Sequence, residues 1–340
     1  MSTPEAPPVT PERIMQFTWG YAPPLIIEAA LRHGIFDLLD KGPKTAEETV
    51  SLCGGSERGV RIIMNALTGL QLLTKDPAGK YALTPESAAF LVSTKPGFQG
   101  GIILHVSAQL IPKWIQLNEV VRTGKPQTAV NSESSGAAFF QQFVEDIFPM
   151  SDPAAQALAA ALGVAKADKP VKVLDLAAGS GVWGIGLARN SPQVSVTAVD
   201  WPEVLSVTKR VAERFGLTKQ FRFVAGDLAT ADFGSGYDIA TLGHILHSEG
   251  AERSRDLLRK VFQALAPGGT IAIAEFLVNE DRTGPPMGLI FAVNMLINTD
   301  VGDTFSFGEI SHWLRAAGFE NPRTLDSPGP SPLILANKPK

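Results

Sequence analysis

One stretch constrains the fold of this chain more than any other, and it runs from Val171 to Asp200. Its residue pattern predicts four consecutive elements: a buried strand at 171–176, a glycine-bearing turn at 177–181, a helix at 182–190 and a buried strand at 194–199. Such a turn lets backbone N–H groups approach a ligand closely, and an acidic residue after the second strand can bind the two hydroxyls of a ribose. The stretch therefore predicts a nucleoside site.

Two classes of nucleoside cofactor fit this turn. Gly179, Gly181 and Gly184 have the spacing G-x-G-x-x-G. Asp200 follows Gly181 by nineteen residues, as in a dinucleotide-binding fold. A nicotinamide cofactor, and with it an oxidoreductase, therefore stays open at this point.

Two carboxylates favour the other class, a positively charged nucleoside. Asp175 precedes the first motif glycine by four residues, where it would repel a pyrophosphate but attract the ammonium group of an amino acid. Asp227 follows a third predicted strand, and its carboxylate can accept a hydrogen bond from an adenine amino group. Two carboxylates without a basic side chain beside them suit a cationic ligand.

From Val171 onward, predicted strands and helices alternate. The strands are expected at 171–176, 194–199, 221–225, 238–242, 270–276, 323–327 and 332–338. The helices are expected at 182–190, 202–215, 252–266, 285–298 and 307–317. This alternation predicts a doubly wound, Rossmann-like α/β fold, a mostly parallel seven-stranded sheet that binds ligands at the carboxyl ends of its strands.

Several short segments occur in the order of a known set of motifs. They are VLDLAAGSG at 173–181, AVD at 198–200, GDL at 226–228, YDIA at 237–240 and LAPGG at 265–269. Together they resemble the motifs of class I S-adenosylmethionine-dependent methyltransferases. More narrowly, the chain resembles the small-molecule O-methyltransferases that carry an N-terminal winged-helix dimerisation domain. The resemblance covers residues 12–338 and implies a last strand that runs antiparallel, although Ala177 and Ala178 stand where the family often has glycines.

The chain is long enough for two domains. Residues 1–11 hold four prolines and are expected to be a disordered tail. Helical patterns followed by a hairpin around Asp76–Gly79 predict a mainly α-helical, winged-helix dimerisation domain at 12–100. Residues 101–165 are expected to be a helical linker that lines an acceptor pocket, and residues 166–340 the cofactor-binding catalytic domain.

Charge and cysteine content restrict the other functions. The net charge is −4, and residues 40–76 hold five basic and five acidic side chains, so a DNA-binding winged helix with a ligand-sensing domain is disfavoured. No apolar run is long enough to span a bilayer. Cys53 is the only cysteine, which excludes an intrachain disulfide and favours a cytoplasmic location. We expect a homodimer that binds neither nucleic acid nor membrane.

The resemblance implies S-adenosylmethionine as the cofactor. The residues expected to bind it are Asp175, Gly179, Ser180, Gly181, Asp200, Trp201, Gly226, Asp227, Leu228, Gly243 and His244.

His247 is the expected general base, because it matches the family's catalytic histidine at the carboxyl end of the fourth predicted strand. Ser248 and Glu249 replace the acidic residue and tryptophan that usually follow. Glu275 ends the neighbouring strand and is expected to orient the imidazole. The family's second acidic residue aligns with Thr304, beside Asp303.

The acceptor is expected to be a small aromatic or polyketide-like molecule. Its predicted contacts are Phe143, Phe148, Met150, Phe291, Asn294, Met295 and Asn298. Core packing is an equal interpretation of the aromatic cluster at 139–150, since apolar stripes at helical spacing are usually core. The sequence shows no spacing typical of a metal site. It does not distinguish a hydroxyl acceptor from an acidic carbon, so a C-methyltransferase stays open.

Overall fold

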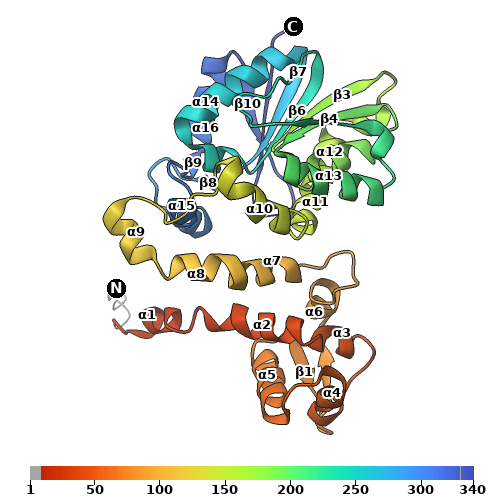
Figure 1. Cartoon of the computed structure of the whole chain (residues 1–340), viewed down its shortest axis with the longest axis vertical. Coiled ribbons are helices and arrows are strands. Elements are labelled where there is room, and N and C mark those ends of the chain that lie inside the picture. The colour runs from red at the N-terminus through yellow and green to blue at the C-terminus, as the bar shows by residue number, and fades with distance from the viewer. Residues whose placement is uncertain (1–8, 330) are drawn as a thin grey trace, which may run out of the picture. The chain divides into compact units, whose positions relative to one another are not determined.

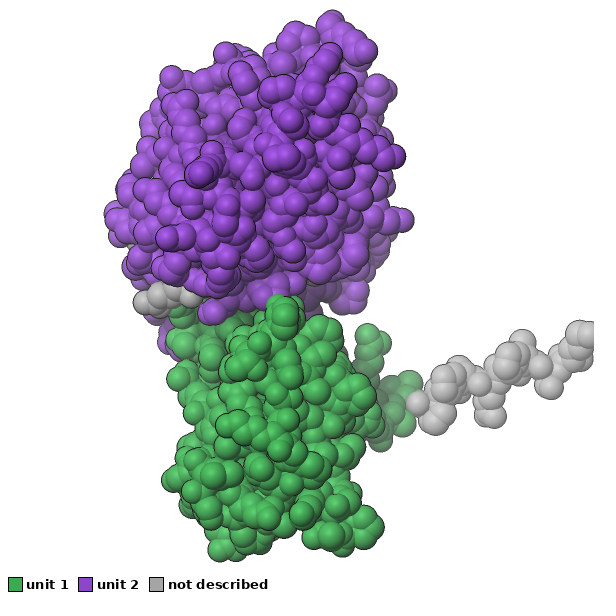
Figure 2. All heavy atoms as spheres, turned by 90° about the vertical axis from the view of Figure 1, so that its right-hand side faces the viewer, with its two compact units in different colours: residues 1–111 green, residues 112–340 purple. Residues whose placement is uncertain are grey.

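The computed structural model of the protein describes residues 9–329 and 331–340. The chain divides after Ile111 into two compact units, residues 1–111 and 112–340, which Figure 2 colours separately. Of the expected tail, the first eight residues lie outside the described ones. No helix in the described part of the chain is long and apolar enough to cross a membrane.

Unit 1 is mainly α-helical. Its elements are α1 (Glu12–Phe17), α2 (Ala22–Arg32), α3 (Ile35–Leu39), α4 (Ala46–Cys53), α5 (Glu57–Gly69), β1 (Leu73–Lys75), β2 (Tyr81–Leu83), α6 (Pro85–Phe90), α7 (Gly100–His105) and the π-helical turn η1 (Val106–Leu110). The last two elements belong to this unit, although most of their residues were predicted to lie in the linker at 101–165.

Helices α3, α4 and α5 and the following hairpin form the predicted winged helix. Strands β1 and β2 pair antiparallel, with Leu73 opposite Leu83. The small core beneath them contains Phe36, Met64 and Tyr81, each at most 1% exposed. These large side chains explain why so short a segment keeps a defined fold.

Unit 2 is built on a seven-stranded sheet with the order β10-β11-β7-β6-β3-β4-β5. Its strands are β3 (Val171–Leu176), β4 (Val194–Asp200), β5 (Phe221–Ala225), β6 (Tyr237–Gly243), β7 (Leu265–Ala274), β10 (Glu320–Leu325) and β11 (Leu333–Asn337). Strand β11 runs antiparallel to both of its neighbours, β10 and β7, and the other pairings in this sheet are parallel, as the family resemblance implied. The predicted fold class is confirmed.

Helices cover both faces of this sheet (Figure 1). Along β3, Val173 packs into the layer of α11 (Phe148–Ala161), α12 (Val182–Ala188) and α13 (Pro202–Arg214), whereas Leu174 packs into the layer of α14 (Leu246–Ala264) and α16 (Phe307–Ala317). Because successive strand side chains point to opposite faces, a strand buried on both sides is apolar throughout.

The remaining elements of unit 2 surround the carboxyl ends of the strands or connect the layers. They are α8 (Ile111–Trp114), α9 (Leu117–Thr123), α10 (Glu133–Phe143), η2 (Val164–Lys166), η3 (Thr218–Gln220), β8 (Leu277–Val278), α15 (Pro286–Asn298) and β9 (Phe305–Ser306). Strands β8 and β9 pair parallel and were not predicted.

Some predicted boundaries differ from the structure. Helix α14 has a break at Gly250 (φ +71°, ψ 174°), and the predicted start at residue 252 matches the part after this break but misses the turn from Leu246 before it. Strand β10 begins at Glu320 rather than at residue 323. Strand β7 begins at Leu265 rather than at residue 270. The glycines of the LAPGG segment lie inside β7, where the register with β6 shifts.

Candidate functional site

The turn between β3 and α12 has a left-handed backbone at three positions: φ is +50° at Ala177, +56° at Gly179 and +78° at Gly181. Glycine adopts these angles freely, whereas an alanine there is strained by about 1–2 kcal/mol. The Thr208 hydroxyl of α13 donates a hydrogen bond to Gly179 O (2.7 Å) and fixes the turn. Ser180 is 2% exposed.

Asp175 lies behind this turn. Its carboxylate has no exposed surface and accepts hydrogen bonds from the Thr241 hydroxyl (2.7 Å) and Gly184 N (3.0 Å). Burial raises the pKa of Asp175 to about 7, although these two hydrogen bonds act in the opposite direction. Direct contact with a cofactor ammonium group, as predicted, does not fit a carboxylate so enclosed. We infer that Asp175 holds the turn instead.

Asp200, the last residue of β4, has both carboxylate oxygens on backbone donors. Oδ2 accepts from Gly179 N (2.8 Å) and Oδ1 from Trp201 N (2.7 Å). Burial raises the pKa of Asp200 to about 6, against the effect of these hydrogen bonds. The Trp201 ring, half-buried, packs near Phe140 with 6.0 Å between ring centroids. The fixed oxygens retain lone pairs that can accept from ribose hydroxyls.

Asp227 follows β5 and Gly226, whose φ of +153° a residue with a side chain would adopt only with strain. Oδ1 of Asp227 accepts from Ala229 N (2.8 Å). Oδ2 has no protein partner among residues 9–329 and 331–340, which leaves an acceptor for a ligand donor such as an adenine amino group. The next residue, Leu228, is buried in the core between the sheet and α14.

Gly243, the last residue of β6, has a structural reason to be glycine. A Cβ at this position would lie 1.8 Å from Nε1 of Trp183 on α12. Glycine therefore lets β6 and α12 approach each other, and its predicted contact with a cofactor stays a prediction.

His244 follows Gly243 with a left-handed backbone (φ +59°). Its Nε2 lies 3.3 Å from the Ser331 hydroxyl and its Nδ1 4.0 Å from Oε1 of Glu275. Burial lowers the pKa of His244 to about 4, with Glu275 acting against it and His247 adding to it. The His244 imidazole is therefore neutral at physiological pH and brings no positive charge to the site.

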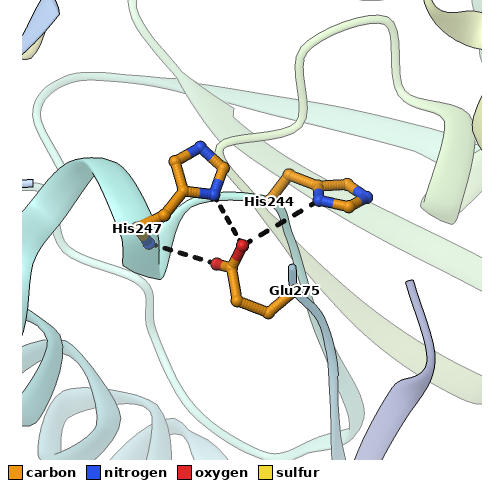
Figure 3. Close-up of side chains that lie close together, drawn as sticks. All are labelled: His244, His247 and Glu275. Carbon is orange, nitrogen blue, oxygen red and sulfur yellow. Dashed lines mark hydrogen bonds and ion pairs between the residues drawn. The ribbon is translucent and has the colours of Figure 1, made fainter. Parts of the chain in front are cut away.

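His247 and Glu275 form the buried pair that the sequence predicted (Figure 3). His247 lies in the first turn of α14, after β6, and Glu275 directly follows the neighbouring strand β7. Nδ1 of His247 is 2.6 Å from Oε1 of Glu275, and the backbone N–H of His247 donates to Oε2 (3.1 Å). Adjacent parallel strands that end together bring the two side chains into contact.

Two opposing effects set the charge of Glu275. Burial by itself raises the pKa of this carboxyl, but the attraction and hydrogen bond of His247, together with His244 and the Phe276 N–H, hold the pKa below its ordinary value. An ionised carboxylate accepts only, so Nδ1 of His247 carries a hydrogen, and in the neutral imidazole the lone pair then lies on Nε2. Nε2 has no hydrogen-bond partner in the part of the chain that the structure describes.

The segment around Thr304 supports His247 through its backbone rather than through a second carboxylate. Asp303 N donates to His247 O (2.9 Å), and a Cβ at Gly302 would lie 2.5 Å from the same oxygen. The Asp303 carboxylate is exposed and accepts from Thr304 N (2.7 Å). The Asp303 carboxylate makes no hydrogen bond or ion pair with the His247 imidazole among the described residues, so the match to the family's second acidic residue stays a prediction.

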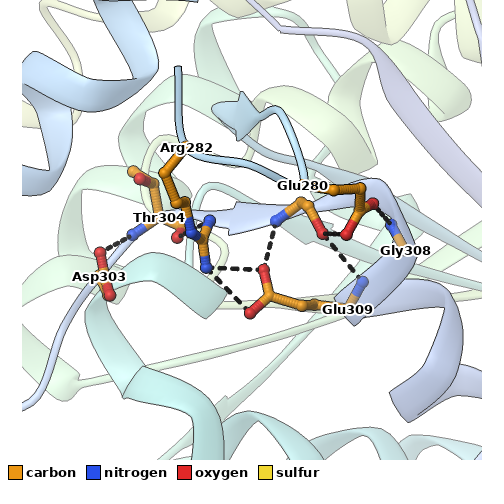
Figure 4. Close-up of polar contacts among 7 residues, drawn as sticks. Glu280, Arg282, Asp303, Thr304, Gly308 and Glu309 are labelled. Atoms are coloured by element: carbon orange, nitrogen blue, oxygen red, sulfur yellow. Dashed lines mark hydrogen bonds and ion pairs between the residues drawn. The ribbon is translucent and has the colours of Figure 1, made fainter. Parts of the chain in front are cut away.

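A polar network braces this segment from outside (Figure 4). Arg282 donates to Thr304 O (2.9 Å) and pairs with both carboxylate oxygens of Glu309. Glu280 accepts from the Ser306 hydroxyl (2.7 Å) and Gly308 N (2.9 Å). The backbone that abuts His247 is thus fixed by charge-assisted hydrogen bonds.

His244, His247 and Glu275 offer donor atoms within 4.8 Å of one another, as metal ligands do. Two ligands of a tetrahedral zinc, each about 2.1 Å from the metal, are about 3.4 Å apart. The 2.6 Å between His247 and Glu275 is instead the length of a charge-assisted hydrogen bond. The geometry therefore favours a proton-handling pair.

Aromatic rings surround the imidazole. The Phe291 ring meets that of His247 nearly at right angles, with centroids 4.8 Å apart. Phe276 packs on Phe291 (4.2 Å) and on His244 (4.9 Å), and it also lines a cavity of about 490 Å³. Phe291 was predicted. Phe276 was missed, although its position directly after Glu275 at a strand end was a usable signal.

Of the predicted acceptor residues on α10 and α11, Phe148 is corrected to core. It is 6% exposed and stacks on Phe215 at 5.3 Å, within the layer between the sheet and α11. The ring centroids of Phe143 and Phe139 are 6.1 Å apart. Met150 is half-buried on α11. For these two the acceptor role stays a prediction.

The carboxamides of α15 bind α8. Asn298 Nδ2 donates to Asn294 Oδ1 (3.2 Å), which confirms that both lie on one helix face. Trp114 Nε1 donates to Asn294 Oδ1 (3.2 Å), and Lys113 Nζ to Asn298 Oδ1 (2.9 Å). Asn298 is 2% exposed and Met295 5%. These contacts disfavour their predicted role as free substrate ligands.

Two family models match the sequence. A model of the O-methyltransferase dimerisation domain matches residues 15–93, and a model of the O-methyltransferase domain matches residues 114–320, more than half of the chain. The chain belongs to the O-methyltransferase family. As a methyltransferase it uses S-adenosylmethionine, so the nicotinamide cofactor and the DNA-binding regulator are set aside.

The sequence matches to two named relatives extend over almost the whole chain. It is 31% identical over 320 residues to 3-hydroxy-5-methyl-1-naphthoate 3-O-methyltransferase of Streptomyces sahachiroi, covering 92% of this chain and 91% of the relative. It is 28% identical over 334 residues to the tetracenomycin polyketide synthesis 8-O-methyl transferase TcmO of Streptomyces glaucescens, covering 97% of each.

Solved structures agree with this fold. The structure of PigF with S-adenosylhomocysteine matches with a TM-score of 0.82 at 25% identity, over 97% of this chain and 100% of that one. Human N-acetylserotonin methyltransferase in complex with S-adenosylmethionine matches with a TM-score of 0.85 at 23% identity, over all of both chains.

Proposed function

We propose that this methyltransferase methylates a hydroxyl of a small aromatic or polyketide-like acceptor, with His247 as the general base. The observation that carries the proposal is the buried His247–Glu275 pair beyond the carboxyl ends of β6 and β7. The names of the naphthoate and tetracenomycin relatives support the acceptor class.

The cofactor site lies at the same edge of the sheet. We assign Asp200 to the ribose hydroxyls and Asp227 to the adenine amino group, with the turn at 177–181 next to the amino-acid part and Trp201 beside the base. The fixed oxygens of Asp200 and the unpartnered Oδ2 of Asp227 fit such a ligand. When bound, S-adenosylmethionine supplies a methyl carbon activated by its positively charged sulfur, which takes the bonding electrons as the methyl leaves.

His247 removes the acceptor proton. Its Nε2 accepts the hydroxyl hydrogen as the acceptor oxygen attacks, and the resulting imidazolium is stabilised by ionised Glu275. An ordinary phenol and an ordinary imidazole differ by about 3.5 pKa units, or about 5 kcal/mol for complete proton transfer. Proton removal therefore accompanies attack, unless substituents acidify the acceptor.

The surroundings of the imidazole suit a planar, apolar acceptor. Phe291 and Phe276 stand beside His247 and His244, and their rings offer flat faces and edges for stacking. Phe143 and Met150 are retained as further wall candidates. Orientation of the acceptor between such walls supplies much of the rate enhancement of a bimolecular transfer.

We infer that the enzyme is a homodimer joined through unit 1. Helices α1 and α2 and the segment between them expose large apolar side chains: Ile14 is 71% exposed, Phe17 74% and Trp19 69%. Several large apolar side chains exposed within one short segment favour a protein interface. The match to the dimerisation-domain model supports this reading, and light scattering of the purified full-length chain tests it.

The chemical test uses S-adenosylmethionine with a deuterated methyl group, the full-length protein and a panel of hydroxynaphthoates and hydroxyanthraquinones. We expect the label on a phenolic oxygen, located by mass spectrometry and NMR. Label on a ring carbon would make the enzyme a C-methyltransferase with the same base. Absence of transfer across the panel, with S-adenosylhomocysteine still bound, would contradict the acceptor class.

A further inference from the structure

Three charged side chains meet beyond the carboxyl end of β5. Arg253 of α14 places Nε 2.6 Å from Oε2 of Glu249 and Nη2 3.6 Å from Oδ1 of Asp227. The side chain of Glu249 is 9% exposed, that of Asp227 30% and that of Arg253 42%. One guanidinium thus lies between two carboxylates, one of them almost buried.

The contact engages only one oxygen of Asp227. Oδ1 accepts a hydrogen bond from the Ala229 N–H (2.8 Å) and lies 3.6 Å from Nη2 of Arg253, an ion-pair distance longer than a hydrogen bond, whereas Oδ2 accepts no hydrogen bond from the described residues. A carboxylate anchored at one oxygen has little rotational freedom, so the free oxygen keeps a fixed direction. This is the property that an acceptor needs in order to recognise one ligand amino group.

Helix α14 also grips the backbone that follows Asp227. Lys260, two turns beyond Arg253, donates to the carbonyls of Leu228 (2.8 Å), Ala229 (3.3 Å) and Ala231 (2.5 Å). Two residues of α14 therefore contact the loop that begins at Asp227. Arg253 lies beside the Asp227 carboxylate, and Lys260 binds main-chain carbonyls of the loop.

The same arginine reaches the turn that carries the catalytic base. Glu249 lies two residues after His247, before the break at Gly250, and Arg253 lies after the break. The Arg253–Glu249 pair spans this break.

We propose that Arg253 is a positioning residue that fixes the Asp227 carboxylate for recognition of the 6-amino group of adenine. The inference rests on the proposed binding of the adenosyl group at Asp227. It assigns Arg253 to base specificity rather than to the transfer step, since its guanidinium contacts Asp227 and Glu249 and not the His247 imidazole.

The test measures affinity in the full-length protein by titration calorimetry with two ligands, S-adenosylhomocysteine and its 6-oxo analogue S-inosylhomocysteine. Arg253→Met keeps the aliphatic stem and removes the charge. We expect about a two- to fivefold loss of affinity for the adenine ligand and no loss for the 6-oxo ligand. Arg253→Lys should restore part of the selectivity.

Arg259→Met is the matched control, because Arg259 is an exposed residue of the same helix that pairs with Asp256. It should leave both affinities unchanged. In an Asp227→Asn background, Arg253→Met should have no further effect on selectivity. If Arg253→Met does not fold, Arg253→Gln takes its place.

Equal losses for both ligands, or no loss, would overturn the role of Arg253. So would a wild-type enzyme that does not distinguish the two bases. If wild-type protein binds no S-adenosylhomocysteine at all, the proposed cofactor site fails first, and the two failures are thereby distinguishable.

Discussion

Nδ1 of His247 lies 2.6 Å from Oε1 of Glu275, while the backbone N–H of the same histidine donates to Oε2. One carboxylate thus fixes both the imidazole and the start of the helix that carries it. This double contact determines the tautomer, because the nitrogen that faces an ionised carboxylate must carry the hydrogen. The other nitrogen is left with the lone pair that a base requires.

Replacement of this carboxylate should therefore slow catalysis without affecting the cofactor. In Glu275→Gln the ionised acceptor is lost, and the imidazole can adopt the tautomer with its hydrogen on Nε2. We expect kcat to fall by about 10- to 100-fold, with unchanged affinity for S-adenosylhomocysteine. Glu252→Gln, an exposed site on α14, is the control. A wild-type kcat in Glu275→Gln would contradict the orienting role.

Asp175 should make stability depend on pH. Its pKa is raised to about 7 in the folded protein, so its contribution is fully present below its unfolded pKa and is lost as pH rises through about 7. In Asp175→Asn, the amide oxygen of the new side chain can still accept from Gly184 N, and its amide N–H can donate to the Thr241 hydroxyl.

Relative to this variant, wild-type protein should lose about 1–2 kcal/mol of stability between about pH 5.5 and pH 8. Denaturant unfolding of both proteins at the two pH values measures the difference. Parallel pH dependences in the two proteins would show that Asp175 is not the titrating group.

Replacement of Ala177 by glycine should increase the stability of the folded protein. Its φ of +50° strains an alanine, and Ala177→Gly removes that strain while it increases the entropy of the unfolded chain. We expect a net stabilisation of about 0.5–1 kcal/mol in thermal unfolding. Ala178→Gly is the control: Ala178 is buried and outside the left-handed region, so the same change there should destabilise. A destabilised Ala177→Gly would contradict the strain.

Transfer should not require a metal. Nδ1 of His247 and Oε1 of Glu275 are 2.6 Å apart, closer than the roughly 3.4 Å between two ligands of one tetrahedral zinc ion. Exhaustive treatment with a chelator, followed by removal of the chelator, should leave the methylation rate unchanged. A loss of rate that added zinc or magnesium restores would contradict this account.

Much of the sheet was predictable, because a strand buried on both faces is apolar at every position, as Val173 and Leu174 show. His247 and Glu275 were predictable as neighbours for a related reason: each follows the end of one of two strands that pair in parallel. The antiparallel direction of β11 came from the family resemblance alone, since strand spacing carries no information on direction.

Other parts of the site depend on contacts that local sequence does not encode. Asn294 and Asn298 have the spacing of ligand-binding amides, but their partners are Trp114 and Lys113, about 180 residues earlier in the chain. The sequence around Asp175 does not reveal whether its carboxylate is buried or exposed to a ligand. Its burial follows from Thr241 and the helix at Gly184, which become its neighbours only in the fold.

The most direct test of the proposed base is the single-turnover rate of His247→Ala with a hydroxynaphthoate that the wild-type enzyme methylates, measured beside the affinity for S-adenosylhomocysteine. His312→Ala, at an exposed site on α16, is the control. We predict that His247→Ala keeps cofactor affinity and loses at least about a hundredfold in rate. An unchanged rate would contradict the account and show that orientation of the acceptor alone drives transfer.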